Sequence, residues 1–118
     1  GKGGTVDIEF LVQMLQLKYG GEYEELRVQN TVDALFVLNS NTLIKDREFK
    51  ILQEGLYFLK KMENLLRLLH DRSINELYES DFDKLAADLD KNNDGKKLKK
   101  EYVSITNGIR KIYDKYFL

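Results

Sequence analysis

The stretch DREFKILQEGLYFLKKMENLLRLL, residues 46–69, decides the fold of this chain. Its large apolar residues recur every three or four positions, a spacing that places them along one face of an α-helix. Proline breaks helix interiors, and the chain contains none. At about 1.5 Å per residue, a helix of this length spans a small domain, so we predict a long central helix. The apolar positions are Phe49, Leu52, Leu56, Leu59, Met62, Leu66 and Leu69.

The same periodicity predicts four further helices on either side of the long one. Two precede it, at about residues 6–19 and 32–38, and two follow it, at about residues 82–89 and 97–117. Nothing alternates with period two for long enough to predict a strand. We therefore expect an all-α fold, a helical bundle of about five helices with one long central helix, forming a single domain over residues 1–118.

Glycine and polar residues mark where these helices begin and end. Gly20 and Gly21 follow the first periodic segment and predict its end. Thr31 is placed to cap the start of the second helix. Gly55 lies inside the long helix, where glycine costs about 1 kcal/mol relative to alanine. Either the helix tolerates this cost, or Gly55 marks a close contact with another helix.

Composition excludes several classes of function. The 19 lysines and arginines nearly cancel the 20 aspartates and glutamates, and a net charge of −1 gives no general attraction to nucleic acid or to an anionic membrane. The absence of cysteine excludes disulfides and thiol chemistry and fits a cytoplasmic location. No apolar run approaches the length of a membrane span. The only histidine, His70, excludes mechanisms that need two imidazoles.

The most informative cluster is KGGTVDIEFLVQ, residues 2–13. Gly3 and Gly4 stand directly before a predicted helix, where they let the backbone approach a ligand and where free N–H groups suit a phosphate. Asp7 and Glu9 in the first turn are able to hold a cation or to orient a basic side chain of a partner. The same two carboxylates also suit the positive end of the helix dipole with no ligand at all.

Taken together with three later segments, this cluster resembles the glutamine synthetase adenylyltransferases, and more loosely the PII uridylyltransferases. Residues 2–13 resemble the segment that follows a catalytic domain in that family. RVQNT at 27–31, YFLKKMENLL at 57–66 and IRKIY at 109–113 resemble, in the same order, helices of the domain that continues it. The resemblance thus covers nearly the whole chain, and it leaves open which half of the two-part enzyme is matched.

The resemblance implies a helical domain of an enzyme that transfers AMP from ATP to glutamine synthetase and removes it again, with an accessory or regulatory role. The family's catalytic domain carries a Gly-Ser pair and an Asp-x-Asp pair that holds Mg²⁺. This chain has no Gly-Ser pair, and its Asp-x-Asp strings at 81–83 and 88–90 stand in a different context. We therefore expect no catalysis and no cofactor in this chain itself, and ATP and Mg²⁺ in the parent enzyme. The expected partners are its own nucleotidyltransferase domain, glutamine synthetase and PII.

On that resemblance, four residues support the neighbouring active site without touching the reacting atoms. Gly3 and Gly4 let the chain cross over into that site, and Asp7 and Glu9 support its metal or nucleotide arrangement. The lysine pair at 60–61 replaces the arginines usual in the family, so paired hydrogen bonds of the arginine type are not expected there.

A second interpretation is a calcium loop. Asp90, Asn92, Asp94 and Glu101 occupy positions one, three, five and twelve of the EF-hand pattern, with Gly95 at the turn. Lysines crowd this segment, and no second loop is available for pairing. A helix–turn–helix connection capped by Asp94 explains the same residues. A third interpretation is a stand-alone helical protein-interaction domain, which an exposed apolar face on the first helix would fit as well as it fits the first interpretation.

Overall fold

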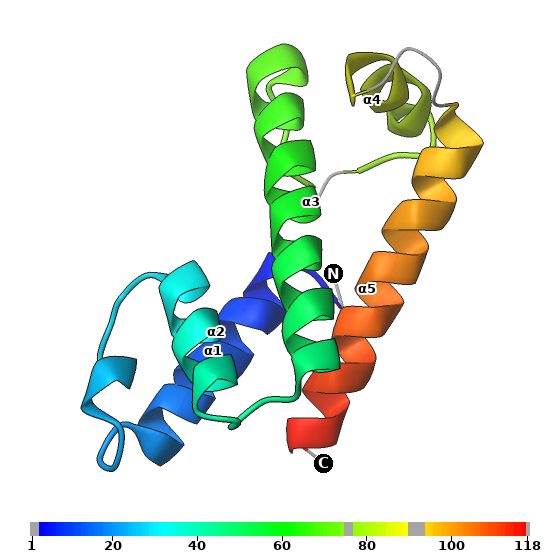
Figure 1. Ribbon diagram of the computed structural model, residues 1–118. Helices are drawn as coiled ribbons and strands as arrows, with labels where there is room; N and C mark the ends of the chain where they lie inside the picture. The colour runs from blue at the N-terminus through cyan, green and yellow to red at the C-terminus, as the bar shows by residue number, and fades with distance from the viewer. Residues whose placement is uncertain (1–2, 75–76, 90–93, 118) are drawn as a thin grey trace.

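A computed structural model describes residues 3–74, 77–89 and 94–117, and every described element of regular structure is helical (Figure 1). This confirms the predicted all-α fold and the long central helix. The elements are α1 (Thr5–Tyr19), the short 3₁₀ turn η1 (Glu24–Leu26), α2 (Thr31–Ser40), α3 (Asp46–His70), α4 (Asp81–Leu89) and α5 (Gly95–Phe117).

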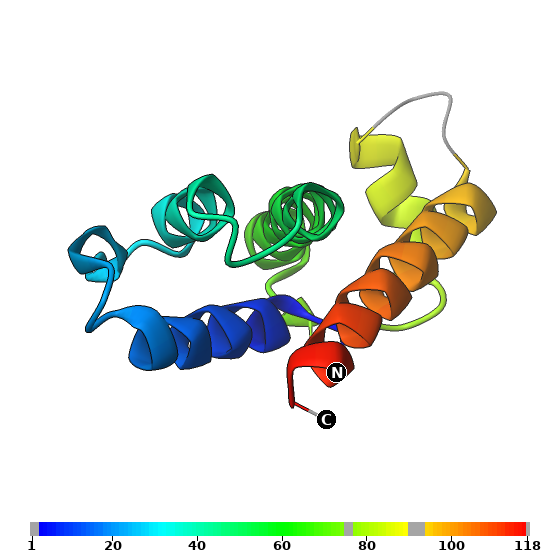
Figure 2. The same cartoon turned by 60° about the horizontal axis from the view of Figure 1, so that its bottom comes forward.

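The helix α3 is the element against which the others are arranged. Both α1 and α2 pack on its first half, α4 packs on its last turns, and α5 runs back along it to meet α1. Figure 2 shows α1 as a layer beneath α2 and α3, with α5 beside it. The molecule is elongated, with principal extents of 46 × 24 × 23 Å. Among the described helices, none is long and apolar enough to cross a membrane.

Two apolar clusters hold these helices together. The larger cluster joins α1, η1, α2, the first half of α3 and the last part of α5, and it includes Ile8, Leu35 and Leu52. The smaller cluster joins the end of α3 to α4 and to the start of α5, through residues such as Met62 and Leu85. Both clusters draw on the same periodic stripe of α3. This is why a single helix of the predicted length is able to organise the whole chain.

Gly55 lies where α3 and α5 cross. A β-carbon at this position would stand 2.9 Å from Cδ1 of Ile109 and 3.3 Å from Cγ2 of Ile105, both on α5. The close contact with another helix is therefore the correct explanation for this glycine. The α5 isoleucines occupy the space that a side chain on α3 would take.

Two helix starts differ from those predicted. Asn30, and not Thr31, caps α2, because its side-chain oxygen accepts hydrogen bonds from the N–H groups of Val32 and Asp33. The helix α5 begins at Gly95, two residues earlier than predicted, and the Asp94 carboxylate accepts from the Lys97 N–H at 2.8 Å. Both shifts follow from side chains that satisfy the free N–H groups of a helix start.

We expect the Gly55→Leu variant to lose about 1–3 kcal/mol of unfolding free energy, because the added side chain forces α3 and α5 apart. Urea unfolding followed by far-UV circular dichroism measures this loss. Gly21→Leu is the matched control, since a β-carbon at Gly21 meets nothing within 4 Å. A Gly55→Leu variant as stable as Gly21→Leu would show that the crossing does not depend on the glycine.

Candidate functional site

Gly3 places the start of the chain against α5. Its φ angle is +80°, a conformation that side chains rarely adopt. A β-carbon here would overlap the Thr106 carbonyl oxygen of α5, at 2.0 Å. The Gly3 N–H donates a hydrogen bond of 2.6 Å to Oδ2 of Asp7 in the first turn of α1. Only glycine fits this position, and the reason is contact between two segments of this chain.

Asp7 continues this connection from α1 to α5. Its Oδ2 also accepts from Nη1 of Arg110 at 3.1 Å, and Arg110 pairs through Nε with Asp114 at 3.1 Å. The Arg110 guanidinium lies 4.4 Å from the ring centroid of Tyr113. We call Gly3, Asp7 and Arg110 the amino-terminal latch. The Asp7 side chain is 16% exposed and that of Arg110 is 31% exposed, so the latch lies at the edge of the core.

Gly4 and Glu9, the other two residues predicted to support a neighbouring active site, lie close to this latch in the sequence. Gly4 is the residue before α1, in an extended conformation, and its carbonyl accepts from the N–H groups of Asp7 and Ile8. Glu9 faces α3, where its Oε1 lies 3.6 Å from Nζ of Lys60. The structure therefore brings Gly3, Gly4 and Asp7 together at α5 and places Glu9 on a different side of α1.

The outward side of α1 is apolar. Val6 is 69% exposed, Phe10 53% and Leu17 88%, and these residues lie on the side opposite the buried Ile8 and Leu15. We call Val6, Phe10 and Leu17 the α1 stripe. Phe10 also contacts Phe117 at the end of α5, with ring centroids 5.8 Å apart. Exposed apolar residues aligned along one helix face are typical of a surface that another protein or domain covers.

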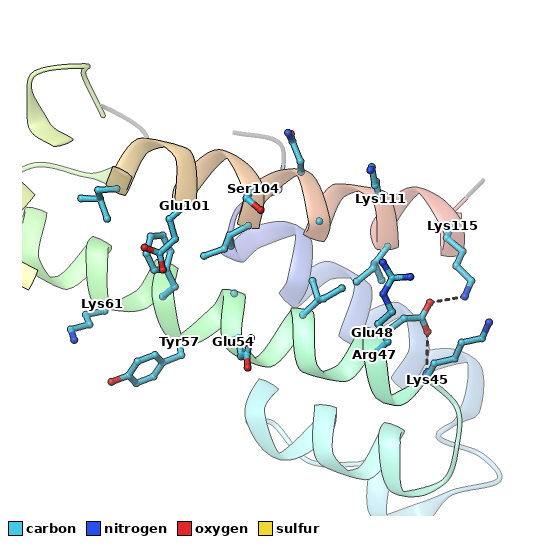
Figure 3. Close-up of a pocket in the computed structure, with 18 of the residues that line it drawn as sticks. Lys45, Arg47, Glu48, Glu54, Tyr57, Lys61, Glu101, Ser104, Lys111 and Lys115 are labelled. Atoms are coloured by element: carbon cyan, nitrogen blue, oxygen red, sulfur yellow. Dashed lines mark hydrogen bonds and ion pairs between the residues drawn. The ribbon is translucent and has the colours of Figure 1, made fainter. Parts of the chain in front are cut away.

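A groove of about 1020 Å³ runs between α3 and α5, on the side away from α1 (Figure 3). It is partly open to solvent. Its charged rim carries Glu54 and Lys61 from α3 and Glu101 from α5, and Figure 3 shows these side chains along its borders. Its apolar and small lining residues are Ile51, Gly55, Phe58, Leu98, Ser104, Ile105, Gly108 and Ile112.

One end of this groove is built around the buried carboxylate of Glu48. Its Oε1 accepts from the Lys45 N–H at 3.0 Å and from the Tyr116 hydroxyl at 2.6 Å, and its Oε2 accepts from Nζ of Lys115 at 2.6 Å. Burial raises the pKa of Glu48, but these hydrogen bonds outweigh burial and hold the pKa below 4.5. Burial and the bond to Glu48 raise the pKa of Tyr116 well above its ordinary value. Glu48 thereby ties the start of α3 to the end of α5.

Part of the proposed calcium loop lies outside the described residues, namely Asp90 and Asn92. Asp94 caps α5 through the Lys97 N–H, as the helix–turn–helix explanation predicts. Glu101 lies on α5 and points toward the α3–α5 groove (Figure 3). Within the described ranges, no three histidine, aspartate or glutamate side chains come close enough together to hold a metal. The full loop remains an untested prediction.

One aspartate of each Asp-x-Asp string near α4 contacts a residue at the end of α3 or just after it. Asp81 is buried, forms an ion pair with Arg72 and accepts from the Tyr78 N–H at 2.8 Å. Asp88 lies 3.7 Å from Nε2 of His70, the last residue of α3. These contacts fasten α4 to the end of α3.

Sequence reasoning found Asp7 but missed its partner Arg110 and the groove. A signal for Arg110 existed, since a lone arginine stands between Ile109 and Ile112, two apolar positions of the predicted α5 stripe. Pairing it with a residue 103 positions earlier requires the fold. The groove likewise depends on how α3 and α5 cross.

Comparison with known protein families identifies the family to which this chain belongs. The family model described as GlnD PII-uridylyltransferase matches residues 1–117. The chain therefore belongs to the GlnD PII-uridylyltransferase family, which confirms the family resemblance of the sequence.

Individual relatives show a more specific similarity than the family model does. The chain is 38% identical over 77 residues to a bifunctional glutamine synthetase adenylyltransferase/adenylyl-removing enzyme of Bradyrhizobium sp., an alignment covering 65% of this chain and 8% of the relative. The Pasteurella multocida enzyme of the same name is 32% identical over 83 residues, covering 70% of this chain and 8% of the relative. The chain thus matches only a small part of these relatives.

We expect Glu48→Gln to lower the unfolding free energy by about 1–3 kcal/mol at pH 7, because buried hydrogen bonds to a charged group are weakened. Since the folded pKa of Glu48 lies below its ordinary value of 4.5, the stabilisation is complete above about pH 4.5 and is lost as the pH falls through the folded pKa. The difference between wild type and variant should therefore shrink in acid. Urea unfolding at a series of pH values measures it.

Glu54→Gln serves as the control for this pH series, because Glu54 is exposed on the same helix. Its stability should follow that of the wild type at every pH. A Glu48→Gln deficit that is equally large at pH 3 and pH 7 would contradict the assignment of the effect to the Glu48 carboxylate.

Proposed function

We propose that this chain is the helical accessory domain of a glutamine synthetase adenylyltransferase, and that it supports AMP transfer to, or AMP removal from, glutamine synthetase in nitrogen regulation. The similarity to the bifunctional enzymes supports this proposal. The observation that carries it is the α1 stripe, a set of exposed apolar side chains next to the amino-terminal latch. The parent enzyme's further partners in this proposal are glutamine synthetase and PII.

In this proposal, the nucleotidyltransferase domain of the parent enzyme covers the α1 stripe. Val6, Phe10 and Leu17 present apolar surface to water on a helix whose opposite side is already buried in the core. Covering such side chains stabilises an interface by about 25 cal/mol per Å² of apolar surface removed from water. The stripe is next to the latch, so both meet the same neighbouring domain.

The latch sets how the backbone enters that neighbouring domain. Gly3 is fixed against α5 by the Asp7 carboxylate and by the close approach to Thr106, and Gly4 follows it directly at the start of α1. Asp7 is thus a positioning residue that acts through the backbone. Glu9 on α1 is partly exposed beside Lys60, and in this proposal it orients a basic side chain of the neighbouring domain.

ATP and Mg²⁺ belong, in this proposal, to the nucleotidyltransferase domain. Asp81 of the first Asp-x-Asp string pairs with Arg72, and Asp88 of the second lies 3.7 Å from Nε2 of His70. The residues of this chain contribute by fixing the position of the two domains relative to each other. Cytoplasmic location follows from the same proposal.

We expect Asp7→Asn in the parent enzyme to lower AMP transfer or AMP removal by about ten-fold, because losing the charged pair with Arg110 lets the Gly3–Gly4 backbone shift. Both activities are measured on glutamine synthetase at a temperature at which circular dichroism shows the variant fully folded. Asp33→Asn is the matched control, since Asp33 is exposed in the first turn of α2. Full retention of both activities by Asp7→Asn would refute the supporting role of the latch.

Leu17→Glu tests the docking of the stripe. In the isolated chain this change should leave the unfolding free energy within about 0.5 kcal/mol, because Leu17 is 88% exposed. In the parent enzyme it should weaken the contact with the neighbouring domain, seen as faster amide hydrogen exchange along α1. Leu68→Glu, on an equally exposed leucine of α3, is the control. Identical exchange along α1 in the Leu17→Glu enzyme and the wild type would contradict the docking.

A further inference from the structure

The α3–α5 groove is long, and it stays exposed when a domain covers the α1 stripe. Its lining residues run from 45 to 61 on α3 and from 98 to 115 on α5. At about 1.5 Å per residue, these segments measure roughly 24 and 26 Å. In Figure 3, α1 lies behind α3 and α5, and none of Val6, Phe10 and Leu17 lines the groove. The groove is therefore a second surface, separate from the one used in the proposed function.

The shape of the groove fits a helix better than a small molecule. Sites for small ligands enclose most of the ligand surface, whereas this groove is only partly enclosed. Half-buried Ile51, Phe58 and Ile105 give it an apolar lining. Ser104 and Gly108 keep the α5 wall low, so a third helix is able to approach closely. A groove of about 24 Å accepts roughly four turns of helix.

The charge at one end specifies the chemistry of that helix. Lys45 just before α3 and Lys115 near the end of α5 bond to the Glu48 carboxylate, and Arg47 and Lys111 line the same end of the groove. Both Glu48 oxygens already accept hydrogen bonds within the chain. The positive end of the α3 dipole and the negative end of the α5 dipole meet here and offset each other, so the charge comes from the side chains. The excess of positive charge at this end is complementary to carboxylates on a partner.

We propose that the α3–α5 groove binds an acidic amphipathic helix of a partner protein. Apolar side chains of that helix pack on Ile51, Phe58 and Ile105, and its carboxylates lie at the basic end beside Arg47 and Lys111. Charge complementarity of this kind sets which helices bind and how fast they associate. The partner binds in trans, because the groove faces away from the surface assigned to the neighbouring domain.

The test uses two synthetic amphipathic peptides of about four to five helical turns. Both carry leucine at positions i, i+3, i+4 and i+7, and they differ only in glutamates or lysines on the flanks. Fluorescence anisotropy with the 118-residue chain should show the acidic peptide binding at least about ten-fold tighter than the basic one. The double variant Arg47→Glu/Lys111→Glu should lose about ten-fold in affinity for the acidic peptide, and Ser104→Trp should block it by filling the groove.

Lys84→Glu is the matched control, because Lys84 is exposed on α4 and does not line the groove. It should bind the acidic peptide like the wild type, and so should Leu17→Glu, which alters only the α1 stripe. Equal or absent binding of the two peptides, or the same loss in Lys84→Glu, overturns the proposal. A wild-type dimer that Ser104→Trp converts to monomer in light scattering also overturns it, because the occupant is then a second copy of the chain. None of these outcomes depends on the function proposed for the latch.

Discussion

The contact between Gly55 and Ile109 fixes how closely α3 approaches α5, and the rest of the structure depends on that approach. With a side chain at position 55, the two helices would stand further apart, and α1 could not touch both of them. The larger apolar cluster needs this closeness, because it draws Leu52 and Leu56 from α3 and Ile112 from α5 into one core with α1 and α2.

The helix α5 contributes residues to two separate surfaces of the molecule. On one side its Thr106 and Arg110 receive Gly3 and Asp7, and on the other it lines the groove opposite α3. Its final turns are held by Glu48, whose carboxylate bonds to Lys115 and Tyr116. The position of α5 therefore sets the geometry of both surfaces.

The helices of this fold follow from local sequence patterns, so they could be predicted from the sequence. A proline-free stripe of apolar residues is sufficient for α3, whereas the start of α5 was predicted two residues too late. Asn30 and Thr31 are both good capping residues, so only the observed hydrogen bonds decide between them. The latch and the groove, by contrast, depend on contacts between helices that are far apart in the sequence. Asp7 was identified from its neighbours along the chain, but its bond to Arg110 depends on where α5 crosses.

A glycine pair before a helix, followed by an acidic first turn, is therefore not by itself evidence of a ligand site. In this chain the close approach made possible by Gly3 is to the Thr106 carbonyl, and the charge of Asp7 is used by Arg110. Neither contact involves another molecule. What the internal contacts leave unsatisfied is apolar surface on α1 and positive charge at the end of the groove. Because Val6 and Leu17 on α1 and Arg47 and Lys111 at the groove end are exposed, these surfaces are better evidence for a partner than the glycine pair is.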